Sequence, residues 1–414
     1  MKWWRSLTRP NQTSVESLLR DVGVSQEELD EAVEDGTLEW VAVDRLVLPE
    51  VPQYSINDLA EQGHDVEQQR LFWRALGFAD VADDDVAFGD TDVEMLELVS
   101  NLLETEQIDL DVALQMTRVM GSSIARIAAS QVDSIEAGVG QQLEELQAES
   151  DAEDEEFNRT EALTEPFIVQ AGQLMAVMPQ IMDYTWRRHI QAAARRKMVR
   201  GADTEGESIT AVGFADIVGF TALSQQLDEK SLATVVERFE MIAYNTVAGM
   251  GGRVIKTIGD EVMFAVEGAR EGLDLALELS DVYGDDEALG DVRVGVAAGP
   301  VLEKDGDLYG PVVNLASRVV ELAYPGSVVV TPEVAAVIEG DDGFHVRALR
   351  RQTIRGVGKV RLYAVRRVGE PSELSTMDLA RARRQAPREG FASPHPSATV
   401  VPKVGYHPPN TRGS

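Results

Sequence analysis

The chain has 414 residues, which is too long for one ordinary hydrophobic core, so about two or three domains are expected. Apolar residues make up 44% and charged residues 26%, proportions typical of packed globular domains rather than of disordered chains. Asp and Glu number 71 against 38 Lys and Arg, giving a net charge of -33. This charge argues against nucleic acid as a partner, because its phosphates would be repelled.

The sequence also lacks the signals of oxidised or membrane-inserted proteins. Cysteine is absent, which excludes disulfides and thiolate metal sites. No apolar run reaches the roughly 18 to 20 residues that a membrane span needs. The N-terminus, MKWWRSLTRPNQ, has a positive start but not the continuous apolar stretch of a secretion signal. These features predict a cytoplasmic protein without a transmembrane segment.

The N-terminal third reads as one helix after another. From residue 14 to about 135, polar starts are followed by apolar residues three and four positions apart, as in Leu110, Ala113, Leu114, Thr117 and Met120. The following run, EELQAESDAEDEEFN at 144–158, is almost wholly acidic and polar. It predicts an exposed helix edge or a linker, with a boundary or hinge nearby.

Residues 167–200 form a helical segment with an unusual composition. Pro179 interrupts the pattern, so a kink or break is expected there. The apolar, Met-rich run FIVQAGQLMAVMPQIM predicts a dimer core, with the lining of a lipid-sized cavity as the alternative. The segment ends in a basic cluster, which is either a solvated helix face or an intramolecular latch to the acidic run. The cluster consists of Arg187, Arg188, Arg195, Arg196, Lys197 and Arg200.

From residue 208 onward, strands alternate with helices. ITAVGFADI is an apolar strand, and a long amphipathic helix follows it, with Phe239, Ile242 and Val247 on one face. RVIKTIGDEVMFAV reads as two strands joined by a tight turn. A helix at 269–282, the strand VRVGVAAG, a helix near 312–323 and short strands complete the pattern. This order predicts the split β-α-β (βαββαβ) arrangement of a ferredoxin-like α+β fold. Residues 369–414, rich in Pro, Ser, Gly and Arg, are expected to be disordered.

Two carboxylates stand where a hard divalent cation could bind. Asp216 ends a strand that turns through Gly219 and Phe220 into a helix at Thr221, whose backbone N–H groups suit a polyphosphate. Asp260 lies at the tip of the predicted hairpin. Together they could hold two Mg²⁺ or Mn²⁺ ions that activate an attacking oxygen and neutralise a leaving group.

Three segments, GFADIVGFTALS, VIKTIGDEVMFAV and GDLYGPVVNLASRVVELAYPGSVVVT, resemble catalytic segments of the class III nucleotidyl cyclases in order and spacing. The resemblance covers roughly residues 208–367. It implies that Asp216 and Asp260 are the metal-binding aspartates. It further implies that Lys256 and Asp307 read adenine, since Lys donates to N1 and Asp accepts from N6. Guanylyl cyclases of the family carry Glu and a small polar or Cys residue at those two places, so ATP is the expected substrate.

The same resemblance assigns the remaining positions. Asn314 corresponds to the asparagine that orients the ribose, and Arg318 to the arginine that stabilises charge on the transferring phosphate. The two lie one helical turn apart, so both side chains leave the same helix face. Arg355 stands where the family usually has a lysine on the triphosphate. The resemblance also implies a head-to-tail homodimer, in which one subunit supplies the aspartates and the other supplies the purine-reading and helix residues.

The N-terminal half resembles the helical regulatory domain of actinobacterial acid-responsive cyclases, through RLFWRALGFADVADDDV and DLDVALQMTRVMGSSIARIAASQV. This implies an autoinhibitory domain joined to the catalytic domain by a switch helix. The hypothesis is that acidification protonates carboxylates at 144–156, together with His189, and so changes the linker. The expected division is an all-helical regulatory domain at 1–160, a helical switch at 161–204, the cyclase domain at 205–368 and a tail at 369–414.

Two other functions compete with adenylyl cyclase activity. Residues 14–76 contain a helix-turn-helix-like stretch, which would fit a DNA-binding regulator with a nucleotide-sensing, non-catalytic cyclase-like domain; the net charge opposes it. A nucleotide sensor that has lost catalysis is opposed by the complete set formed by Asp216, Asp260, Asn314 and Arg318. The sequence does not reveal the regulatory signal or the preferred metal.

Overall fold

A computed structural model describes residues 19–20, 23–35, 37–48, 50–105, 108–153, 159–202, 209–286, 288–289 and 291–369. The chain divides into two compact units, 1–205 and 206–414. Most of the predicted tail and the end of the acidic run, at 370–414 and 154–158, lie outside the described residues. Within the part described, no helix combines the length and the apolarity needed to cross a membrane.

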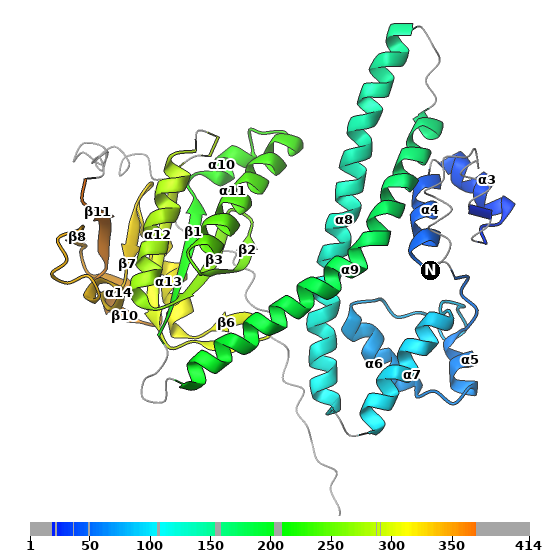
Figure 1. The fold of residues 1–414 in the computed structure, drawn as a ribbon, viewed down its shortest axis with the longest axis horizontal. Coiled ribbons are helices and arrows are strands. Elements are labelled where there is room, and N and C mark those ends of the chain that lie inside the picture. The colour runs from blue at the N-terminus through cyan, green and yellow to red at the C-terminus, as the bar shows by residue number, and fades with distance from the viewer. Residues whose placement is uncertain are drawn as a thin grey trace, which may run out of the picture. The chain divides into compact units, whose positions relative to one another are not determined.

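The first unit is helical, as the sequence predicts (Figure 1). Its helices end in two 44-residue ones that pack against each other. The helices are α3 (Gln26–Asp35), α4 (Leu38–Val47), α5 (Ile56–Glu61), α6 (Val66–Leu76), α7 (Asp90–Glu104), α8 (Leu110–Glu153) and α9 (Arg159–Ala202).

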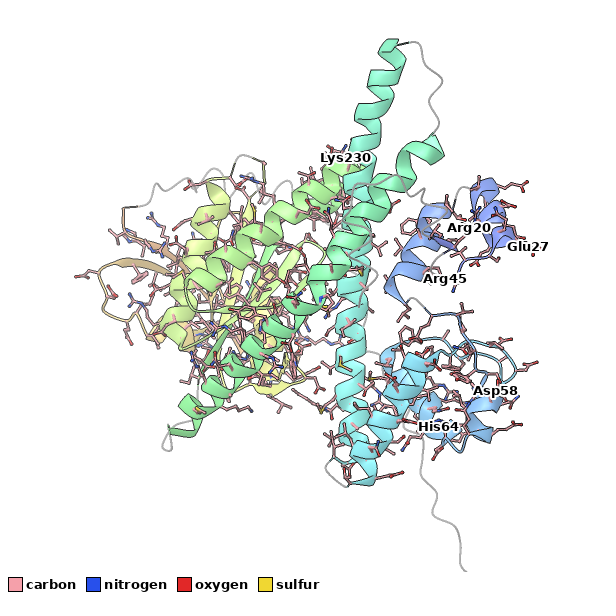
Figure 2. All side chains as sticks on the ribbon, turned by 45° about the vertical axis from the view of Figure 1, so that its right-hand side comes forward. Arg20, Glu27, Arg45, Asp58, His64 and Lys230 are labelled. Atoms are coloured by element: carbon pink, nitrogen blue, oxygen red, sulfur yellow. The ribbon has the colours of Figure 1, made fainter. Side chains whose placement is uncertain are left out.

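Local polar contacts fix the short helices of this unit. Ser55 caps α5 by accepting a hydrogen bond from the Asp58 N–H, while the Asp58 carboxylate accepts one from the Ser55 N–H. Arg45 of α4 pairs with Glu28 of α3 at 2.8 Å. Figure 2 labels Arg45 and Asp58 on their helices. The beginning of α5 is therefore determined by nearby sequence.

Small apolar clusters join the short helices to the long ones. Ile135 of α8 packs with Ala171 and Leu174 of α9 and Val43 of α4. Ala171 and Leu174 belong to the apolar, Met-rich run, so this part of the run packs within the unit. Helix α9 continues through Pro179, so the expected break is absent. A proline removes only one intrahelical hydrogen bond, and neighbouring bonds maintain the helix. The ribbon of α9 does change direction part-way along (Figure 1).

The second unit is built on a seven-stranded sheet with the order β2-β3-β1-β4-β7-β11-β8. Among the described strands of this sheet, β4 and β7 pair in parallel and the other neighbours pair antiparallel. The strands are β1 (Thr210–Ile217), β2 (Arg253–Ile258), β3 (Glu261–Glu267), β4 (Val292–Gly299), β7 (Val328–Val330), β8 (Phe344–Ala348) and β11 (Tyr363–Arg367). The part β2-β3-β1-β4, with helices after β1 and β3, is the ferredoxin-like arrangement, so the predicted α+β fold is confirmed.

Helices and hairpins cover the sheet. The helices are α10 (Phe220–Ser224), α11 (Glu229–Gly249), α12 (Ala269–Gly284), α13 (Pro311–Glu321) and α14 (Pro332–Ala336). The hairpins are β5 (Leu302–Lys304) with β6 (Asp307–Tyr309), and β9 (Gln352–Ile354) with β10 (Gly358–Val360).

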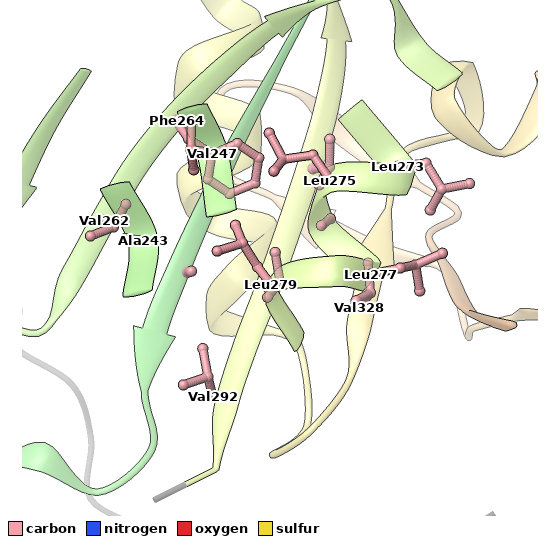
Figure 3. Packing of buried hydrophobic residues seen from close by; sticks show 14 of the residues in the cluster. Ala243, Val247, Val262, Phe264, Leu273, Leu275, Leu277, Leu279, Val292 and Val328 are labelled. Atoms are coloured by element: carbon pink, nitrogen blue, oxygen red, sulfur yellow. The ribbon is translucent and has the colours of Figure 1, made fainter. Parts of the chain in front are cut away.

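The sheet has a different core on each face. Helices α11 and α12 cover one face, where Val247, Phe264 and Leu275 are buried together (Figure 3). On the other face, Phe214 of β1 packs with Leu308 of β6 and Val320 of α13. Because side chains alternate along a strand, central strands such as β1 and β3 contribute to both cores. The predicted site residues all come from elements of this second unit.

Candidate active site

Asp216 and Asp260 are brought together at one end of the central strands. Asp216 is the penultimate residue of β1, and Asp260 follows Gly259 in the turn between β2 and β3. Gly259 has φ 63°, a conformation that favours glycine. The Ile217 N–H donates to the Asp260 carbonyl oxygen at 3.1 Å, which fixes the turn beside β1. The predicted strand end and hairpin tip therefore meet in space.

The surroundings of Asp216 are strongly charged. Its side chain is buried and accepts a hydrogen bond at 2.5 Å from Arg293 of β4. Burial raises the pKa of Asp216, the neighbouring Arg293 opposes this, and Asp260 raises the pKa further. Glu261, directly opposite Asp216 in the sheet, has its pKa raised to about 7, chiefly by burial and then by Asp216 and Asp260. Asp216 and Glu261 thus lie close to one arginine, which lowers the pKa of each against the effect of burial.

This donor set fits a magnesium-type ion. Within the described residues, no group of three or more His, Cys, Asp or Glu side chains forms a complete metal cage. Mg²⁺ seldom uses such a cage, since it is usually bound by one or two carboxylates together with water and substrate phosphates. Asp216 and Asp260 would supply those carboxylates, and their crowded negative charge would be relieved by a cation.

Lys256 and Asp307 also come together, although 51 positions separate them. The Lys256 ammonium donates to Asp307 Oδ2 at 2.5 Å. The other oxygen, Oδ1, accepts from the Leu308 N–H at 2.8 Å. Both side chains are partly exposed, at 39% for Lys256 and 27% for Asp307, so a planar ligand could reach them. The Lys256 ammonium, a hydrogen-bond donor, therefore lies beside the Asp307 carboxylate, an acceptor.

Asn314 and Arg318 lie on α13, whose place is set by a close approach to the sheet. A Cβ on Gly295 of β4 would lie 2.3 Å from the Val320 backbone nitrogen, so only glycine allows this contact. Asn314 is exposed and Arg318 is partly buried. A Cβ on Gly356 would lie 3.7 Å from Arg318 Nη1, so this guanidinium lies against the β9–β10 turn. That turn also carries Arg355, which is exposed.

The predicted phosphate-binding turn begins α10. Gly219 precedes this helix with φ 79°, and its carbonyl accepts from the N–H groups of Ala222 and Leu223. Phe220 and Thr221 form the first turn, and Gly219 and Thr221 are exposed. The turn directly follows the strand that carries Asp216.

The catalytic residues predicted from sequence thus form separate groups in one chain. Asp216 lies with Asp260, Lys256 with Asp307, and Arg318 beside the turn of Arg355. Among the described residues, no hydrogen bond or ion pair links Asn314 or Arg318 to the aspartates. Their catalytic roles remain predictions.

Sequence reasoning missed Arg293 and Glu261. Both lie in segments that were read only as strands, VRVGVAAG and the DEVMFAV part of the hairpin. Antiparallel pairing puts both beside Asp216 on neighbouring strands. The one available signal for Arg293 was an arginine within an otherwise apolar strand, because a buried cation needs a carboxylate partner.

Comparison with known proteins adds independent support. Residues 203–367 match the family model for the adenylate and guanylate cyclase catalytic domain. An adenylate cyclase of Glutamicibacter nicotianae is 30% identical over 326 residues, covering 73% of this chain and 76% of that protein. This chain belongs to the class III adenylate cyclase family. The resemblance noted in the sequence is therefore confirmed, and the chain is an enzyme of this family.

Further relatives of this cyclase show how far the likeness extends. A pH-sensitive adenylate cyclase of Mycobacterium tuberculosis is 30% identical over 328 residues, covering 76% of this chain and 78% of that protein. This alignment is longer than the catalytic-domain match, so it extends beyond that domain. The crystal structure of adenylyl cyclase CyaB from P. aeruginosa matches with 22% identity, covering 41% of this chain and 97% of that chain, with a TM-score of 0.34.

Proposed function

We propose that this cyclase converts ATP into 3′,5′-cyclic AMP and pyrophosphate, at sites formed between two copies of the chain and with two Mg²⁺ or Mn²⁺ ions at each site. The observation that carries the choice of ATP is the contact between Lys256 and Asp307. Since ATP is held in the cytoplasm of cells, we place the reaction there.

The Lys256–Asp307 pair matches the edge of adenine. N1 of adenine accepts a hydrogen bond, and the N6 amino group donates one. Lys256 has only donors to offer, and a carboxylate at Asp307 has only acceptors. Guanine presents the reverse pattern on the same edge, so it would place donor against donor and acceptor against acceptor.

The reaction is in-line attack of the ribose 3′-hydroxyl on the α-phosphorus. The new O–P bond closes the ring and the hydroxyl proton passes to water. The bond to the β-phosphate oxygen breaks, and pyrophosphate leaves with that electron pair. Asp216 and Asp260 would hold the metal ions, which when bound lower the pKa of the hydroxyl and neutralise phosphate charge. Asn314 orients the ribose. Arg318 faces the charge that develops on the α-phosphate, an interaction worth about 3 kcal/mol by comparison with other fixed donors.

The direct test is product formation by the purified full chain. It is incubated with ATP or GTP plus Mn²⁺, and cyclic nucleotide and pyrophosphate are measured. We expect cyclic AMP and pyrophosphate in equal amounts, with much less product from GTP. A chain that binds ATP but releases neither product would instead be a nucleotide sensor.

Exchanging the purine-reading residues should change the preferred substrate. In Lys256→Glu combined with Asp307→Ser, the glutamate accepts from the guanine edge and the serine can donate to it. We expect kcat/KM for ATP to fall about a hundredfold and the GTP-to-ATP preference to rise. Steady-state kinetics with both nucleotides check this.

Lys230→Glu makes the same charge change as Lys256→Glu alone, at the exposed start of α11, and serves as the control. It should leave the nucleotide preference unchanged. An exchanged variant with the wild-type ATP-to-GTP ratio would remove the basis for assigning ATP to this pair.

Control of activity by the N-terminal unit, with pH as an input, is the second part of the proposal. It is supported by the likeness to the pH-sensitive relative, which extends outside the catalytic match. His189 is exposed on α9, and the neighbouring Arg187 pairs with Asp183 at 2.9 Å. The side chains of the acidic run at 144–158 all lie outside the described residues, so the contacts of this run stay a prediction.

Comparing pH profiles tests this control. The activity of the full chain and of a chain shortened to residues 200–414 is measured between about pH 5 and 8. If protonation of the acidic run and of His189 loosens the linker, the full chain should gain activity on acidification relative to the shortened one. Superimposable profiles would rule out the N-terminal unit as the pH-responsive part.

A further inference from the structure

A second ion pair joins β2 to the β5–β6 hairpin, beside the purine-reading pair. Arg253 Nη1 donates to Glu303 Oε1 at 2.8 Å. These two side chains are 25% and 19% exposed, so they are more buried than Lys256 and Asp307 at 39% and 27%. Two cations of one strand therefore contact two carboxylates of one hairpin.

A β-bulge makes this double contact possible. Arg253 lies opposite Ala265 of β3, and Lys256 lies opposite Met263, so Ile255 is the extra residue. In a regular strand, residues three positions apart point to opposite faces. The bulge shifts the alternation by one residue and places Arg253 and Lys256 on the same face. Ala265 and Met263 belong to the core on that face, together with Leu308 of the hairpin.

The two ion pairs hold different faces of the hairpin. Its two-residue turn consists of Asp305 and Gly306, with φ 56° and 82°. In the register of the two strands, Glu303 lies directly opposite Leu308. Asp307 lies opposite Lys304 in this register, so its side chain belongs to the opposite face of the hairpin from that of Glu303. Contacts on both faces limit rotation of the hairpin about its own axis. Such rotation would move the Asp307 oxygens away from the Lys256 ammonium.

Stability alone does not account for Arg253. Its Nη2 is buried and has no hydrogen-bond partner, a condition that disfavours the folded state. Replacing a buried ion pair by apolar residues of similar size is often neutral or stabilising. We therefore expect the protein to fold when both residues of the pair are replaced, so a role of the pair in positioning can be tested.

We propose that Arg253 and Glu303 are positioning residues that set the purine selectivity of this cyclase by orienting Asp307 against Lys256. The inference rests on the proposed use of ATP. Neither residue touches the nucleotide. Arg253 holds Glu303, and Glu303 holds the hairpin at the angle at which the Asp307 acceptor and the Lys256 donor match adenine.

The test compares Arg253→Met, the double variant Arg253→Met with Glu303→Leu, and Arg253→Lys. For the first two we expect the ratio of kcat/KM for ATP to that for GTP to fall about tenfold, mainly through a higher KM for ATP, with kcat largely kept. Arg253→Lys retains a cation and should recover most of the selectivity. The double variant should unfold at a temperature close to that of the wild type.

The Arg238–Asp286 ion pair provides a matched control. It joins α11 to the loop after α12 at 2.7 Å. Arg238→Met should leave the ATP-to-GTP ratio unchanged. If Arg253→Met and the double variant also keep the wild-type ratio, the proposal is overturned.

Amide hydrogen exchange separates this inference from the proposed function. In Arg253→Met, residues 302–309 should exchange faster than in the wild type, whatever the protein catalyses. A wild type that forms no cyclic AMP contradicts the proposed function, and faster exchange would then still support positioning of the hairpin. An active wild type together with unchanged exchange and unchanged selectivity in the variant contradicts the inference alone.

Discussion

Replacing Asp216 by Asn should lower cyclic AMP formation about a thousandfold or more while leaving the protein folded. The carboxylate would hold the metal ions with Asp260, and metal ions supply several kcal/mol of stabilisation to the charge of the transition state. Each 1.36 kcal/mol is about a tenfold change in rate, so loss of this interaction leaves little activity. The measurement is product formation at saturating ATP and Mn²⁺.

Asn is preferable to Ala at this position because Asp216 also has a structural contact. Its side chain is buried against Arg293, and an amide oxygen can still accept from that guanidinium. Thermal unfolding then shows whether the loss is catalytic. Asp342→Asn, at an exposed turn before β8, removes the same charge elsewhere and should keep full activity. Retention of more than about a tenth of the wild-type rate in Asp216→Asn would place the metal ions elsewhere.

The clustered carboxylates explain why this position should be so sensitive. Asp216, Asp260 and Glu261 lie together, and Arg293 is the basic residue that opposes the raised pKa values of Asp216 and Glu261. A site with this excess of negative charge holds its carboxylates at a cost in free energy, which a divalent cation would offset. An amide at 216 removes part of that cost and also removes a ligand.

The fold of the catalytic unit could be predicted from the sequence because each local signal agreed with the topology. Apolar continuity marked β1, which is buried along its whole length, and the Gly259–Asp260 turn marked the hairpin. Helix α11 buries Phe239, Ile242 and Val247, as its periodicity predicted. These features depend on residues close together in the chain.

Contacts set by strand register could not be predicted in the same way. Arg293 lies beside Asp216 because β1 and β4 pair in one particular alignment, which no motif in either strand specifies. The sequence gives no signal for the bulge at Ile255 either, because the residues on both sides of it are ordinary strand formers. At Pro179 the sequence predicted a kink or a break; α9 continues through this residue and its ribbon changes direction part-way along, so only the break is absent.

Mixing two inactive variants should restore activity, which tests whether the site is shared between subunits. Asp216→Asn and Arg318→Ala would each be inactive alone. In a heterodimer of the two, one site combines both intact halves and the other combines both damaged halves. Random pairing makes about half of the dimers mixed, each with one working site, so about a quarter of the wild-type activity is expected.

The structure gives this experiment its internal control. Asp216 and Asp260 lie together within one chain, whereas no contact among the described residues joins them to Arg318. A mixture of Asp216→Asn with Asp260→Asn damages the metal half of both sites, so it should stay inactive. Co-expression with two different tags and tandem purification isolates the mixed dimers, and their specific activity should then rise to about half that of the wild type. If neither mixture regained activity, each chain would have to build its own site.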